Sequence, residues 1–209
     1  MRVVAPLNSG LRRIPVWPLY VAGAIYAVWS FVHAAQGGLG PDPVKALEHR
    51  FGLLGLQLLV ITLAVTPLRR LTGVTLLRFR RALGLLAFAS ICVHLLIWAV
   101  LEVQLDTGEL VTDVLERPYI TIGMVGFLVM VPLAATSTDR ALRRLGPQAW
   151  RRLHRLGYVA ALAGAIHFLM LVKAWPVEPL LYLAAVIGLL ILRWPGLARF
   201  ASGAAGRAR

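Results

Sequence analysis

The chain has 209 residues, of which 59% are hydrophobic, and its mean hydropathy is +0.75. This apolar share is well above that of soluble domains, so the composition excludes a soluble globular protein and indicates an integral membrane protein. The net charge of +13 does not require a nucleic-acid partner, because basic residues that flank membrane helices give the same total.

Six apolar segments follow one another along the chain, each close to the length of a transmembrane helix. Arg2, Arg12 and Arg13 precede the first, as in a signal peptide, but the segment is long and lacks an A-x-A site, so we expect a retained helix. The predicted helices span roughly residues 16–35, 51–68, 82–101, 119–136, 156–172 and 177–194. The sequence therefore predicts an all-α bundle of six transmembrane helices, forming one domain over residues 1–209 without a soluble flavin or nicotinamide domain.

Charged residues divide the connections between these helices into two groups. The second–third and fourth–fifth connections are rich in arginine, whereas the other three hold eight of the nine acidic residues. The arginines are Arg69, Arg70, Arg78, Arg80 and Arg81 in one connection and Arg140, Arg143, Arg144, Arg151, Arg152 and Arg155 in the other. By the positive-inside rule, both termini are expected in the cytoplasm, which agrees with an even number of spans.

Two histidines lie at the same depth in the third and fifth predicted helices. His94 is 12 residues beyond Ala82, and His167 is 11 residues beyond Leu156, so both are about 17–18 Å from the inner face of the membrane. Two facing imidazoles at this depth suit the axial ligands of a b-type haem. An interhelical hydrogen bond for each ring explains the spacing equally well. Zinc is a poorer match because it prefers three or four protein ligands.

A third histidine, His154, lies 13 residues before His167 in what is predicted to be the same long helix. It is about 20 Å nearer the cytoplasm, where a second redox site is expected, although the two rings are about 140° apart around an ideal helix. The arginines at this level have two possible roles. Their charge only sets the orientation of the protein in the membrane, or their guanidinium groups bind a haem propionate or a flavin phosphate. The candidates for this role are Arg80, Arg81, Arg151 and Arg152.

His49 lies near the outer membrane boundary, where it is either an interfacial polar residue or a contact at the outer face of a cofactor. No carboxylate is expected beside the membrane histidines, because all nine acidic residues lie in connections or near helix ends. That arrangement argues against a proton-coupled transporter. The single cysteine, Cys92, excludes an iron–sulfur cluster and c-type haem attachment.

Seven motifs resemble those of the ferric-reductase-like transmembrane family and, within it, of the MsrQ family. They are GGLGPDPVKALEH, TLAVTPLRRLTG, RFRRALGLLAF, RPYITIGM, PLAATST, RRLHRLGYVA and IHFLMLVK, and they run from about Gly37 to Lys173. The resemblance implies a six-helix haem core with haem b and FMN as cofactors. By motif, the family's haem histidines fall on His94 and His167, with His154 a third candidate.

The resemblance also implies a role in electron transfer in the bacterial inner membrane, as a subunit of an oxidoreductase rather than its catalytic subunit. Electrons would come from the quinone pool or a cytoplasmic flavin reductase. They would pass to MsrP, a periplasmic molybdopterin enzyme that reduces methionine sulfoxide in oxidised proteins. NADPH oxidases of the same family have two histidines on each ligand helix, whereas Arg80 stands at the inner position here, so a second bis-histidine haem is not expected.

The sequence leaves two alternative functions open. One is a free-standing cytochrome b that reduces ferric iron or quinone. The other is a redox-inactive membrane transporter or scaffold whose histidines are packed and hydrogen-bonded between helices.

Overall fold

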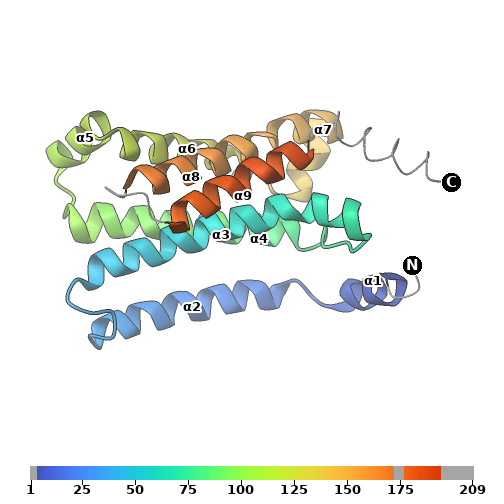
Figure 1. Ribbon diagram of the computed structural model, residues 1–209, viewed down its shortest axis with the longest axis horizontal. Helices are drawn as coiled ribbons and strands as arrows, with labels where there is room; N and C mark the ends of the chain where they lie inside the picture. The colour runs from blue at the N-terminus through green and yellow to red at the C-terminus, as the bar shows by residue number, and fades with distance from the viewer. Residues whose placement is uncertain (1–3, 172–176, 194–209) are drawn as a thin grey trace.

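The protein is an all-α bundle whose long helices run side by side (Figure 1). The computed structural model describes residues 4–171 and 177–193. Their elements are α1 (Val4–Arg13), α2 (Trp17–Ala35), α3 (Pro43–Thr72), α4 (Arg80–Leu96), the π-helical turn η1 (Ile97–Glu102), α5 (Thr107–Glu116), α6 (Pro118–Ala135), α7 (Asp139–Leu153), α8 (Leu156–Leu171) and α9 (Val177–Arg193). The expected all-α fold is confirmed for these residues, whereas the predicted helix ends at residues 172 and 194 lie outside them.

Within the described residues, four helices are long and apolar enough to cross a membrane, namely α2, α3, α4 continued by η1, and α6. Helices α7 and α8 make a fifth candidate span if the two, which are bent by 42°, are counted together. Helix α9 is described over 17 residues, which is at the short end of what a span requires. The apolar helices identify a membrane protein, and the count of six spans stays a prediction.

Helix α3 begins at Pro43, eight residues before the predicted start at residue 51. The Asp42 side chain accepts a hydrogen bond from the Lys45 backbone N–H at 3.1 Å, and Pro43 occupies the first helical position. Hydropathy marks only the apolar part of a helix, whereas this cap sets its true beginning. The correction brings the whole 43–50 segment, including His49, into the helix.

The segment from Trp150 to Met170 is not one helix, so the prediction that His154 and His167 share a continuous helix is wrong. Helix α7 ends at Leu153 and α8 begins at Leu156. Between them the backbone bonds tighten from i−4 to i−3 at Arg155, whose N–H donates to the Arg152 carbonyl at 3.1 Å. The rotation of 140° calculated for an ideal helix therefore does not apply.

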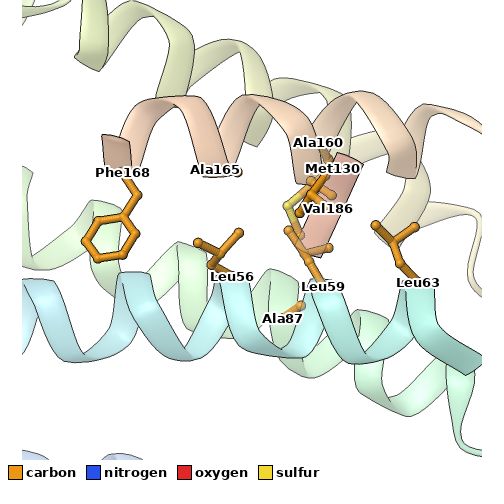
Figure 2. Packing of buried hydrophobic residues seen from close by; sticks show 10 residues of the cluster. Leu56, Leu59, Leu63, Ala87, Met130, Ala160, Ala165, Phe168 and Val186 are labelled. Atoms are coloured by element: carbon orange, nitrogen blue, oxygen red, sulfur yellow. The ribbon is translucent and has the colours of Figure 1, made fainter. Parts of the chain in front are cut away.

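The core lies where α3, α4, α6, α8 and α9 pack together, while α2 contacts α3 and α4 at the edge of the bundle. Helix α8 contributes small side chains, among them Ala160, Ala161 and Ala165, all of which are buried. Small residues let membrane helices approach closely. Figure 2 shows Leu59 and Met130 meeting near Val186, in the middle of this core.

The two ends of the bundle differ in charge, and Figure 1 shows which elements lie at each end. The basic end consists of α1, the 69–81 segment and α7; the acidic end consists of the 36–42 turn, η1 and α5. At the basic end, the Asn8 side chain donates to the Gly73 carbonyl and accepts from the Thr75 N–H, at 3.0 and 2.9 Å. These bonds hold α1 against the connection between α3 and α4.

Arg193 of α9 binds a carbonyl that Pro67 of α3 leaves without its helical partner. Proline has no N–H, so the Leu63 carbonyl, four residues earlier, loses its usual bond. Arg193 donates to this carbonyl from Nε at 3.1 Å and from a terminal nitrogen at 2.6 Å, and it donates to the Tyr158 hydroxyl at 3.0 Å. A neighbouring helix thereby satisfies the freed backbone group, as a membrane interior requires.

Replacing Arg193 by methionine is expected to destabilise the protein by about 1–3 kcal/mol, because a buried carbonyl loses its donor. Denaturant unfolding in detergent micelles measures the change. Pro67→Ala restores a backbone N–H at position 67, so the loss caused by Arg193→Met should shrink in the Pro67→Ala background. An equal loss in both backgrounds would show that Arg193 stabilises the protein by another route.

Candidate functional site

Helices α3, α4, α6 and α8 surround a cavity, here called the outer cavity, with about 680 Å³ of empty space that includes its opening to the surroundings. Its polar lining side chains are His49, His94 and His167. The other lining residues are Gly52, Leu53, Leu56, Leu59, Ile91, Gly123, Gly126, Phe127, Met130, Ala160, Gly164, Phe168 and Leu171. The structure therefore brings the two depth-matched histidines into one largely apolar cavity.

The rings of His94 and His167 face each other across the outer cavity, with centroids 6.2 Å apart and planes at 82°. Each ring has its Nδ1 beside a backbone carbonyl, that of Glu48 at 2.9 Å for His94 and that of Tyr119 at 2.6 Å for His167. A carbonyl only accepts, so Nδ1 bears the proton and Nε2 keeps its lone pair. Metal-binding histidines are oriented in this way.

Each ring also packs on a glycine of the neighbouring helix. A Cβ added at Gly52 would lie 3.0 Å from Nδ1 of His94, and one added at Gly123 would lie 2.9 Å from Nδ1 of His167. Each glycine comes four residues after the carbonyl that holds the same ring, so carbonyl and glycine are stacked one helical turn apart. A backbone carbonyl and a glycine one turn later thus position both histidine rings in the same way. The role of Gly52 was not predicted, because no pattern in one sequence shows which glycine meets a ring on another helix.

The donor set fits a planar metal macrocycle such as haem. Metal–nitrogen bonds of about 2.0–2.1 Å on both sides, plus the radius of each ring, require roughly 6 Å between the centroids, and 6.2 Å is observed. Within residues 4–171 and 177–193, no group of three or more His, Cys, Asp or Glu side chains is placed to hold a metal ion. Two imidazoles alone suffice when the macrocycle supplies the equatorial ligands.

Glu48 lies beside His94, so the expectation that no carboxylate accompanies the membrane histidines is wrong. Its Oε1 is 4.0 Å from Nε2 of His94, and its side chain is 23% exposed. The early start of α3 explains the error, because it places Glu48 within the helix rather than in a connection. The argument against proton coupling that depended on this absence no longer holds.

A second and larger cavity, here called the inner cavity, opens at the basic end, with about 1560 Å³ of empty space that includes its opening to the surroundings. It is lined by three of the four predicted arginines, Arg80, Arg81 and Arg151, together with His154. The fourth, Arg152, is not among its lining residues and is exposed. Arg155, which lies in the turn between α7 and α8, lines the cavity instead. The inner cavity is therefore a strongly positive site.

His154 is held differently from the two outer histidines. Its ring stacks on Trp150 with centroids 3.7 Å apart, and its Nε2 lies 3.1 Å from Oγ1 of Thr136. That hydroxyl donates to the Pro132 carbonyl at 2.6 Å, so it accepts from His154 and Nε2 bears the proton. A role for His154 as a second-site ligand stays a prediction, and this hydrogen bond does not favour ligation through Nε2.

The two cavities are separated by a thin apolar layer. Leu59 of α3 and Met130 of α6 line both of them. Figure 2 shows these two side chains close together, between Phe168 on one side and Leu63 on the other. The bundle thus holds an inner positive site and an outer bis-histidine site on either side of one layer of side chains.

Comparison with known proteins identifies the family. The family model for the ferric reductase like transmembrane component matches residues 51–165, which is more than half of the chain. Proteins from Brucella ovis, Brucella canis and Brucella suis, each named protein-methionine-sulfoxide reductase heme-binding subunit MsrQ, are 51% identical to the chain over 178 residues. The alignment covers 85% of this chain and 80% of each relative. The chain therefore belongs to the ferric-reductase-like transmembrane family and, within it, to the MsrQ family.

Proposed function

We propose that this protein is the membrane electron-transfer subunit of a methionine-sulfoxide reductase system. It delivers electrons through haem b to a periplasmic molybdopterin reductase of the MsrP type, which repairs oxidised periplasmic proteins. The observation that carries the proposal is the pair of facing histidines, His94 and His167, in a largely apolar cavity. The Nε2 atom of each ring keeps a lone pair with which it can bind a metal. The names of the relatives, which are haem-binding subunits, support the same cofactor.

His94 and His167 are the residues that would hold this haem, which supplies a one-electron iron couple when bound. The carbonyls of Glu48 and Tyr119 keep the two rings in the ligating tautomer. The lining is mostly apolar, and the polarity around a haem is one of the factors that set its reduction potential. In this proposal the chain transfers electrons and leaves the chemistry on methionine sulfoxide to its partner.

The inner cavity is the proposed site of electron input. Its arginines suit an anionic group such as the phosphate of FMN, because guanidinium groups bind phosphate through charge-assisted, bidentate hydrogen bonds. The donor is either the quinone pool or a cytoplasmic flavin reductase. Arg152 is exposed next to this cavity, where it is available to an approaching donor protein rather than to the cofactor.

The proposed orientation places the basic end in the cytoplasm and the acidic end in the periplasm, with both termini inside. The distribution of arginines between the two ends supports it through the positive-inside rule. The protein then lies in the bacterial inner membrane as six helices. Electrons enter at the inner cavity and leave from the outer cavity, which is the nearer of the two to the acidic end.

Spectroscopy of the purified protein tests this function directly. The purified protein should contain haem as its main bound cofactor. Its spectrum should show a Soret band that shifts when dithionite is added. In the absence of oxygen, NADH and a flavin reductase should reduce this haem, and an MsrP-type reductase with methionine sulfoxide should reoxidise it. A colourless preparation would contradict the proposal and favour a transporter or scaffold. Reoxidation by ferric iron or quinone, but not by the reductase, would favour the free-standing cytochrome.

A further inference from the structure

His49 is the polar side chain of the outer cavity that remains once His94 and His167 are assigned to the iron. Among the described residues that line the cavity, all others are apolar side chains or glycines. The His49 ring lies against Phe168, with centroids 5.7 Å apart. No hydrogen bond joins this ring to another described residue, so its polar nitrogens are available to a ligand.

The position of His49 gives the outer cavity a polar side and an apolar side. On α3, His49 comes one helical turn before Gly52, toward the acidic end. In the opposite direction the cavity is lined by Leu56 and then Leu59, where the apolar layer closes it. A ligand that fills the cavity therefore meets a hydrogen-bonding group on its outer side and only hydrocarbon on its inner side.

A b-type haem has one polar edge, made by its two propionates, and is otherwise apolar. Placing a carboxylate among leucine and methionine side chains without a hydrogen-bond donor costs several kcal/mol. When bound, the haem would therefore avoid placing its propionate edge on the inner side of the cavity and would turn it toward His49. His94 and His167 would hold the iron but would leave the macrocycle free to rotate, so a separate contact would be needed to fix its rotation.

We propose that His49 binds the propionate edge of the cofactor held between His94 and His167 and so fixes the rotation of the macrocycle in the outer cavity. The inference rests on the proposed haem site and assigns to it a third residue with a different task. His49 donates a ring N–H to the carboxylate. That bond offsets the negative charge near the iron, which otherwise stabilises the ferric state.

Replacing His49 by phenylalanine tests the assignment, with the midpoint potential from spectroelectrochemical titration as the main measurement. The variant should keep its haem and its low-spin bis-histidine spectrum, because both axial ligands remain. Its midpoint potential should fall, and its Soret circular dichroism should change because the macrocycle turns. His49→Gln and His49→Lys retain donors, so both should have potentials above that of His49→Phe.

His33→Phe is the matched control, because His33 is also near the acidic end but stacks on Trp29 and does not line the cavity. Its potential and circular dichroism should equal those of the parent protein. Equal potentials in His49→Phe and His49→Lys would overturn the inference and leave His49 as an interfacial polar residue. Loss of the low-spin spectrum in His49→Phe would also overturn it, since His49 would then be an axial ligand. Absence of haem from the unmodified protein is a distinct result that refutes the proposed function itself.

Discussion

Replacing His94 or His167 by alanine is expected to remove most of the haem from the outer cavity. Each substitution deletes one of the two imidazoles that would hold the iron. Changes that only misorient a metal-binding histidine lower affinity by about 10–100-fold, so loss of the ligand itself should exceed about tenfold. Haem per chain, from the pyridine haemochrome spectrum, and the low-spin character of any haem that remains provide the measurement.

The other histidines supply the controls for this experiment. His33→Ala removes a ring of the same kind outside both cavities, so its haem content should match that of the parent protein. His154→Ala changes only the inner cavity and reports whether a second haem is bound there. The ligand assignment fails if a chain that lacks both His94 and His167 keeps its full haem content and an unaltered spectrum.

The pairing of His94 and His167 could be predicted because depth in a membrane helix follows from residue count. The rise of 1.5 Å per residue is the same in every α-helix, and apolar segments mark where each helix meets the membrane. Two histidines that lie almost the same number of residues from the start of two parallel helices must therefore lie at almost the same depth. The structure adds that they face each other at 6.2 Å, which depth alone does not determine.

Other features of the site depend on contacts that hydropathy does not encode. The start of α3 at Pro43 is set by a polar cap, so Glu48 and His49 were expected outside the helix or at its boundary. The break after Leu153 is a local change in backbone bonding, which the apolar pattern of residues 150–170 does not reveal. Arg155 rather than Arg152 lines the inner cavity, because Arg155 lies in the turn between α7 and α8, and a charge pattern does not show where that turn falls.

Adding a single methyl group beside either ring should also impair haem binding, although both ligands remain. In Gly123→Ala the new Cβ would lie 2.9 Å from Nδ1 of His167, and in Gly52→Ala it would lie 3.0 Å from Nδ1 of His94. Each ring must then move away from the carbonyl that fixes its tautomer. We expect haem affinity to fall by about 10–100-fold, as for other losses of a group that orients a metal-binding histidine, with Gly123→Ala the more severe. Titration of the haem-free protein with haemin measures the effect.

Gly188→Ala on α9 is the matched control, because nothing lies within 4 Å of its added Cβ. Alanine favours helix over glycine by about 0.8–1.0 kcal/mol, so this variant should bind haem normally and be equally or slightly more stable. In the haem-free state Gly52→Ala and Gly123→Ala share this backbone benefit, which offsets part of the cost of moving a ring. A loss of haem affinity without a matching loss of haem-free stability therefore identifies displacement of the ligand. Unchanged haem affinity in both variants would instead show that the histidines bind haem without being positioned by the neighbouring glycine and carbonyl.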